Sequence, residues 1–222
     1  MEGPGAPGPL LIACALGIEH LALRRGLGRP GPAPGGDGHG GTGHVRLLRS
    51  GMGPQAARRA VTGALEGEAV RGGTAVLATG FCAGLASGMR PGDLVVADET
   101  RDASGHTPCT GTELLAAALA PYGTVHTGPL AGSDHVVRGA ERAALHSTGA
   151  IAADMESAAT LGAAASGTAR RPVAAVRVVV DAPGHELIRV GTLRGGISAF
   201  RVLRGVLPAF LEWHRSLLLP WR

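Results

Sequence analysis

The sequence predicts a single-domain α/β fold. Apolar segments of strand length alternate with segments whose apolar residues recur at helical spacing, as expected when helices cover a sheet. The 222 residues are enough for a sizeable core, and no internal repeat is visible. The run VAAVRVVV at 173–180 is rich in β-branched residues and almost uninterrupted, which predicts a central strand.

The N-terminal part begins with a tail and contains one long loop. Residues 1–9 are expected to be disordered, and 10–222 to form the domain. LLIACAL at 10–16 is typical of a buried strand, and Glu19 begins a short helix. The segment 26–43 is rich in Gly and Pro and cannot bury enough apolar surface to fold alone. A flexible insertion is favoured there over a lid.

Strands and helices continue to alternate through the rest of the chain. Pro54 suits the first turn of a helix, because its missing N–H costs nothing there. A glycine-rich turn after Leu77 is expected to lead into a return strand that opens at Pro91. The further strands are expected at 45–49, 74–80, 93–98, 122–127, 129–137, 150–153 and 173–180. The further helices are expected at about 54–70, 111–119, 138–147, 154–166 and 191–216.

The charge pattern argues against a nucleic-acid-binding protein. The net charge is +4, and all 21 basic residues are arginines spread along the chain. A nucleic-acid groove usually shows clustered basic residues with aromatic residues between them, and aromatics make up only 3%. A weak attraction to anionic membrane surfaces is the remaining electrostatic expectation.

The cysteines and the apolar runs favour a cytoplasmic protein. Cys14, Cys82 and Cys109 lack metal-ligand spacing and are expected to be buried, reduced thiols, so no metal site is predicted. No signal-peptide pattern is evident, and no apolar run approaches the roughly 20 residues that span a bilayer. Peripheral contact with a membrane stays open.

Acidic side chains stand at the ends of three apolar runs. Glu19 follows the first strand, Asp154 and Glu156 lie at a strand-to-helix junction, and Asp181 ends the most hydrophobic strand. Open α/β sheets bind ligands where strands end. The structural alternatives are a helix-dipole glutamate, an N-cap aspartate and a turn aspartate.

Together these acids suggest cleavage of a glycosidic bond. The transition state resembles an oxocarbenium ion, so one acid would protonate the leaving base and one would orient water. Glu156 could accept hydrogen bonds from two vicinal ribose hydroxyls. Phosphate is the alternative nucleophile, cradled at Gly51 and Gly53, although turn glycines explain that pattern equally well.

The chain resembles the nucleoside phosphorylase and nucleosidase superfamily, on the methylthioadenosine/S-adenosylhomocysteine nucleosidase side. The resemblance covers most of residues 10–200 and rests on SGMGPQAARRAV, ATGFCAGLASGMRPGDLVVADE, ADMESAA and VRVVVD, in the expected order. It implies a mixed, twisted sheet that closes partly into a barrel and is flanked by helices. It also implies an enzyme without a cofactor, and at least a homodimer.

The resemblance also assigns roles to residues. Glu19 is similar to the acid that positions or deprotonates the water, which leans toward hydrolysis without deciding it. Asp181 matches the acid that protonates purine N7, and an aspartate there implies adenine as the base. Met155 and Glu156 match ribose contacts. The remaining substrate-binding positions that it implies are Phe81, Cys82, Ala83 and Gly84.

Departures from the nucleosidase pattern concern the pocket. Phe81 replaces a serine, and the loop 26–43 and the segment 181–190 also differ. The G-F-C turn with PGDLVVA resembles the hopanoid-associated phosphorylase branch, which implies adenosylhopane as substrate and release of adenine. Nucleosidases for methylthioadenosine/S-adenosylhomocysteine or for futalosine are the sister alternatives. A non-catalytic nucleoside-binding protein is the rival from another class.

Overall fold

A computed structural model describes residues 8–27, 45–67, 73–166, 171–183 and 192–217, with the side chains of 192–196 left out. Most of the expected 1–9 tail and nearly all of the expected 26–43 loop lie outside these residues. The strands are β1 Leu10–Cys14, β2 Val45–Arg49, β3 Ala75–Gly84, β4 Leu94–Asp102, β5 Gly105–Pro108, β6 Val125–Gly132, β7 Ala152–Asp154 and β8 Val173–Asp181.

Helices follow or separate the strands, as the alternating pattern predicts. They are α1 Gly17–Gly26, α2 Pro54–Leu65, α3 Thr112–Leu119, the short 3₁₀ helix η1 Ala120–Tyr122, α4 Ala140–Ser147, α5 Ser157–Ala165, α6 Thr192–Gly205 and α7 Leu207–Ser216. Among the described residues, no helix has both the length and the apolar character that crossing a membrane requires.

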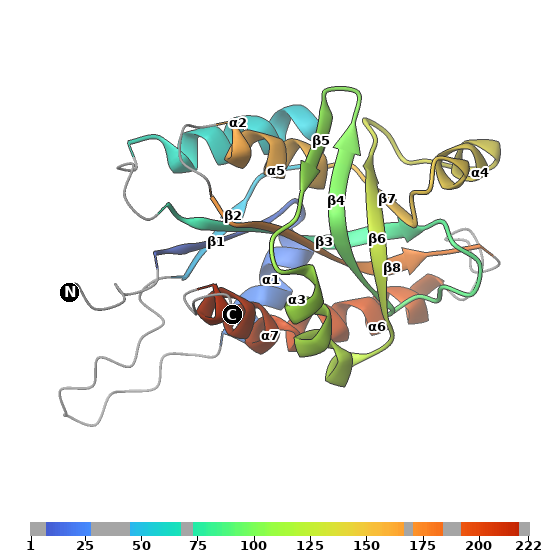
Figure 1. Cartoon of the computed structure of the whole chain (residues 1–222). Helices are drawn as coiled ribbons and strands as arrows, with labels where there is room; N and C mark the ends of the chain where they lie inside the picture. The colour runs from blue at the N-terminus through green and yellow to red at the C-terminus, as the bar shows by residue number, and fades with distance from the viewer. Residues whose placement is uncertain (1–7, 28–44, 68–72, 167–170, 184–191, 218–222) are drawn as a thin grey trace.

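All eight strands belong to one mixed sheet (Figure 1). The order is β2-β1-β3-β7-β6-β4-β5, and β8 pairs with both β3 and β4. The strands β3, β7, β6, β4 and β8 therefore close into a ring, because each of them pairs with the next and β8 returns to β3. The α/β class and the partly barrel-like mixed sheet are both confirmed.

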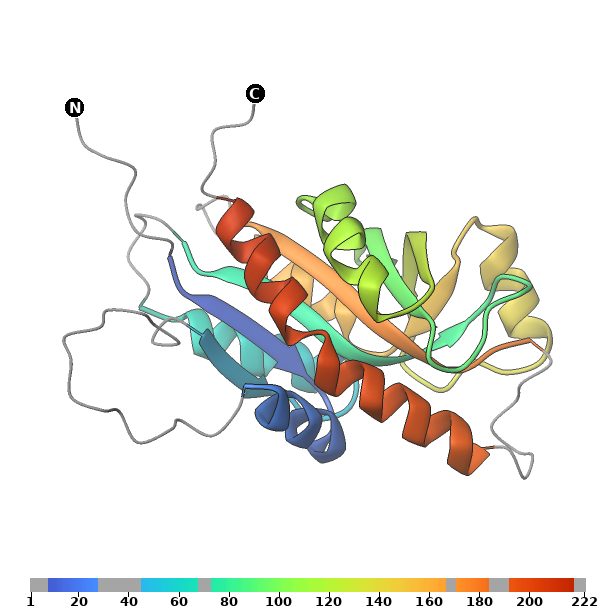
Figure 2. The same cartoon turned by 90° about the horizontal axis from the view of Figure 1, so that it is seen from below.

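The core lies on both faces of the sheet because side chains alternate along each strand. Leu10 and Ile12 of β1 belong to the core covered by α1, α6 and α7. Leu11 and Ala13 belong to the core covered by α2 and α5. Figures 1 and 2 show these two helix layers on opposite sides of the sheet.

Several expected boundaries were wrong. The strand near 74–80 continues to Gly84, and the two strands expected at 122–137 are one strand, β6. The hairpin strand β5 was missed, because its residues GHTP carry no apolar alternation. The helix expected at 191–216 is broken at Val206, since Pro208 has no N–H to continue the ladder.

Candidate active site

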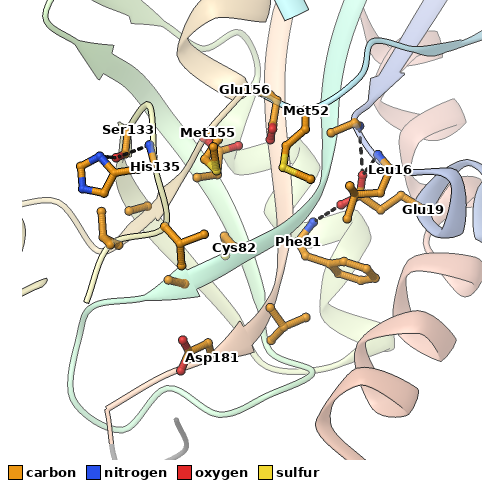
Figure 3. Close-up of a pocket in the computed structure, with 17 residues that line it drawn as sticks. Leu16, Glu19, Met52, Phe81, Cys82, Ser133, His135, Met155, Glu156 and Asp181 are labelled. Atoms are coloured by element: carbon orange, nitrogen blue, oxygen red, sulfur yellow. Dashed lines mark hydrogen bonds between the residues drawn. The ribbon is translucent and has the colours of Figure 1, made fainter. Parts of the chain in front are cut away.

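A pocket of about 230 Å³ lies where β1, β7 and β8 end, and residues near the C-terminal end of β3 also line it (Figure 3). It brings together the carboxylates of Glu19, Glu156 and Asp181, which lie far apart in the chain. The pocket's remaining lining is mainly apolar. Those residues are Ala15, Leu16, Met52, Phe81, Cys82, Ala83, Ser133, His135, Val136, Val137, Ala153, Asp154, Met155 and Val180.

Glu19 is fixed by backbone N–H groups from two elements. Its Oε2 accepts hydrogen bonds from the N–H groups of Ala15 at 2.9 Å and Leu16 at 2.8 Å. Its Oε1 accepts one from the N–H of Phe81 in β3, also at 2.8 Å. The carboxylate is buried, so these three donors replace the water that burial removes.

Gly80 lets β3 pass close to this carboxylate. Its φ is +139°, and a Cβ there would collide with Glu19 Oε1 and come within 2.6 Å of Arg177 Nη1. Both groups belong to rigid, buried parts of the site, so neither could move away cheaply. The glycine is therefore required at this position by space as well as by backbone conformation.

Arg177 lies behind the pocket, and the sequence pattern did not single it out. Its fully buried guanidinium pairs with Asp154 at 2.5 Å, and donates to Ser157 Oγ at 2.9 Å and to the Thr79 carbonyl at 3.0 Å. The available signal was a single arginine inside the most apolar strand, because a charge buried there needs a partner.

Asp154 was expected at the N-cap or in the first turn of the helix, but it is the last residue of β7 and the N-cap of α5 is Glu156; its carboxylate neutralises Arg177. Its carboxylate accepts hydrogen bonds from the N–H and the hydroxyl of Ser157, the first residue of α5. The sequence reasoning started this helix at 154, whereas it starts at Ser157. Asp154 and Glu156 therefore lie in the strand-to-helix turn rather than on a helix face.

Glu156 faces the pocket with one oxygen already bound. Its Oε1 accepts a hydrogen bond from the N–H of Gly53 at 2.9 Å. Burial raises the pKa of Glu156 above its ordinary value of 4.5, while the charge of Arg177 opposes that shift. The phosphate loop expected at Gly51 and Gly53 stays a prediction, but in this structure the Gly53 N–H is engaged by a carboxylate.

Asp181 is held by a side chain rather than by the backbone. Its Oδ2 lies 2.7 Å from Nη2 of Arg142 in α4, and both side chains are largely buried. Within the described residues, Asp181 Oδ1 is buried and has no hydrogen-bond partner. Arg142 carried no sequence signal, because the pair joins positions that only the fold brings together.

The other expected substrate-binding residues divide into two groups. Met155, Phe81, Cys82 and Ala83 line the pocket, whereas Gly84 is absent from its lining and packs against Met89.

The three cysteines are free, and two of them are buried as expected. Burial raises the pKa of the Cys82 thiol strongly, so it contributes an apolar surface rather than a thiolate.

The loop after β6 supplies lining that the sequence reasoning mistook for a strand. His135 and Val136 lie in this loop, and Val136 is exposed at the mouth of the pocket. Hydrogen bonds to the carboxylates of Asp134 and Glu141 raise the pKa of His135.

No group of three metal-ligating side chains able to hold an ion occurs among the residues that the structure describes.

Comparisons place this geometry among known proteins. A family model described as the phosphorylase superfamily matches residues 11–193. No curated protein matches significantly. The MTA/SAH nucleosidase of Streptococcus pneumoniae, solved with 8-aminoadenine, superposes with a TM-score of 0.70 at 22% identity, over 92% of this chain and 99% of that one.

Two further solved structures give the same picture. The 5′-methylthioadenosine/S-adenosylhomocysteine nucleosidase of Neisseria meningitidis has a TM-score of 0.70 at 18% identity, over 94% of this chain and 99% of its own. A futalosine hydrolase mutant of Helicobacter pylori has a TM-score of 0.72 at 16% identity, over 92% and 99%. These likenesses confirm the nucleoside phosphorylase-like fold that the sequence resemblance implies.

Proposed function

Because this chain belongs to the phosphorylase superfamily, we propose that its pocket cleaves the N-glycosidic bond of an adenine nucleoside. The observation that carries the proposal is the convergence of Glu19, Glu156 and Asp181 on one pocket. A glycosidic reaction needs separate groups to protonate the leaving base, to hold the sugar and to activate the nucleophile. The nucleosidase from Streptococcus pneumoniae was solved with 8-aminoadenine, which supports the choice of base.

The three carboxylates divide the chemistry as follows. In its acid form, Asp181 donates a proton from Oδ1 to purine N7 while the bond between C1′ and the purine nitrogen breaks. The bonding electrons go to the purine, which leaves neutral. Water attacks C1′ and gives its proton to Glu19. Glu156 accepts hydrogen bonds from the ribose hydroxyls, which strengthen as positive charge grows on the sugar.

The charge of the pocket favours water over phosphate as the nucleophile. The described lining contains four acids, Glu19, Asp154, Glu156 and Asp181, and no arginine. Arg177 is already engaged by Asp154 and two neutral oxygen atoms. A phosphate carries roughly two negative charges, so the carboxylates of this pocket would repel it. Hydrolysis is therefore the reaction that we propose.

The substrate that we propose is an adenosine conjugate with an apolar 5′ substituent, and adenosylhopane is the candidate that the sequence resemblance names. The pocket of about 230 Å³ is below the roughly 300–1,000 Å³ of sites that enclose drug-sized ligands. A bulky substituent would therefore extend past the mouth. Met52 and Val136 are exposed there and would offer it an apolar rim.

Adenine release from a panel of nucleosides tests the proposal. Adenosylhopane, methylthioadenosine, S-adenosylhomocysteine and futalosine would be incubated with the protein, with and without phosphate. We expect adenine from adenosylhopane without any need for phosphate. Cleavage of another member would move the assignment to a sister activity, and a strict phosphate requirement would refute hydrolysis. Nucleoside binding without release would favour the non-catalytic alternative.

A further inference from the structure

The side of the molecule opposite α2 and α5 carries a cluster of arginines. The helices α1 and α6 lie side by side there, so closely that a Cβ on Gly26 would come within 2.5 Å of the Arg204 carbonyl oxygen (Figure 2). Their exposed arginines are Arg24, Arg25, Arg201 and Arg204.

The same two helices expose large aliphatic side chains. Ile18, Leu21 and Ile197 are 53%, 42% and 46% exposed. They are half of the six exposed large hydrophobic residues found in the described part of the chain. Ile18 and Leu21 share a helix face with Arg25, and Ile197 shares one with Arg201 and Arg204, because residues three, four and seven apart point the same way. We call these six side chains, together with that of Arg24, the basic-apolar face.

Within the described residues, α1 and α6 carry no exposed acid that would balance this face. The one acid of α1, Glu19, is buried in the pocket, and α6 contains no acid. The next acid after α6, Glu212 of α7, lines a groove with Leu114 and Ala117 of α3 instead. A small cleft at the end of α1 adds apolar surface. Its lining residues are Gly26, Leu27, Leu207, Pro208, Leu211 and Arg215.

We propose that the basic-apolar face binds the surface of an anionic lipid bilayer. Arginines attract acidic headgroups, and aliphatic side chains between them enter the boundary of the acyl chains. Proteins bind single-stranded nucleic acids by stacking bases on exposed aromatic side chains, and the seven residues of this face include none. A second copy of the chain fits poorly, because a two-fold contact would place this cluster of arginines against itself.

The face begins beside the pocket. Leu16 and Glu19, at the start of α1, line the pocket, and the exposed Ile18 lies between them in the chain. Binding of the face to a bilayer would therefore bring the mouth close to the lipid surface. This last consequence rests on the proposed function, whereas the lipid binding itself does not.

Vesicle sedimentation without any nucleoside tests the lipid binding. We expect the full chain to sediment with vesicles of phosphatidylcholine mixed with phosphatidylglycerol, to release at high salt, and to bind pure phosphatidylcholine weakly. Arg24→Gln with Arg25→Gln should weaken binding roughly 25-fold, since each surface arginine contributes about a fivefold factor. Ile18→Asn with Leu21→Asn should weaken it at high salt as well as at low salt.

A matched control keeps the test specific. Arg58→Gln with Arg59→Gln removes the same charge from α2, on the opposite side of the sheet, and should leave most of the binding intact. The Arg24/Arg25 variant should still cleave a water-soluble nucleoside at the wild-type rate, so failure of lipid binding and failure of the proposed function are separable. Equal losses in both charge variants, no preference for phosphatidylglycerol, or tighter binding to RNA than to vesicles would overturn the proposal.

Discussion

The two ends of the pocket hold their carboxylates in different ways. At one end, Glu19 accepts three backbone N–H groups and Glu156 accepts one, so their positions follow from the paths of β3 and of the turns that precede α1 and α2. At the other end, Asp181 is held by the single side chain of Arg142. That arginine comes from α4, a helix with no buried residue.

This difference separates the fixed part of the site from the adjustable part. Backbone donors cost no side-chain entropy and move only with the sheet, so the end that we propose to hold sugar and water is preorganised. An ion pair from a lightly packed helix can break and form again as a base enters or leaves. We therefore expect substitutions at the two ends to have different signatures.

Asp181→Asn is expected to have the largest effect. Asparagine keeps the shape but has no proton to give to the purine, so adenine release should fall roughly 100- to 10,000-fold. The fold should stay intact, although the thermal unfolding midpoint should fall, because the amide leaves the largely buried Arg142 without its counter-charge. Initial rates of adenine release and a melting curve measure both quantities. An Asn variant that retains near-wild-type turnover would remove Asp181 from the mechanism.

Arg177→Met tests the fixed end through stability. The substitution leaves the Asp154 carboxylate buried without its cation, which should cost about 3–5 kcal/mol of unfolding free energy. Urea denaturation measures the loss. Asp154→Leu combined with Arg177→Met should recover part of it, because neither charge is then left alone. If the double variant is less stable than Arg177→Met alone, the cost of Arg177→Met does not come from leaving Asp154 unpaired.

Arg142→Met tests the adjustable end. It should lower adenine release by roughly tenfold, equal to about 1.4 kcal/mol, because Asp181 loses its only ion-pair partner in the described structure. The rate of Arg142→Lys should lie between those of Arg142→Met and the wild type. Neither substitution should much change the affinity for ribose. Steady-state kinetics of the three proteins would separate these effects. A rate unaffected by Arg142→Met would show that the pair does not position Asp181.

Glu156→Gln should have the smallest effect on stability, and the size of that effect depends on pH. The raised pKa means that the folded protein binds this proton more tightly than the unfolded chain, so wild-type stability falls as pH rises from 4.5 through the folded pKa. The Gln variant should therefore be slightly more stable than wild type in neutral buffer and equal to it in acid. Melting curves of both proteins across pH test this difference in stability. In the same variant, the rate of adenine release should fall. A Gln variant that is less stable at neutral pH would contradict the assigned cause.

Most of the fold, but only part of the site, could be predicted from the sequence. The strand at 173–180 and the acids at strand ends were readable, because burial and position follow from local pattern. The pairs of Arg177 with Asp154 and of Arg142 with Asp181 were not, since each joins residues separated by at least 23 positions. The strand β5 was also missed, because it is defined by pairing with β4 rather than by composition.

Isotope tracing of the attacking oxygen tests the central claim most directly. The protein would turn over its adenosine substrate in water enriched in oxygen-18, with unlabelled phosphate present. The account predicts free adenine and a sugar that carries the heavy oxygen at C1′, with no sugar phosphate. A sugar 1-phosphate as the product, or no adenine from any adenosine conjugate, would contradict it.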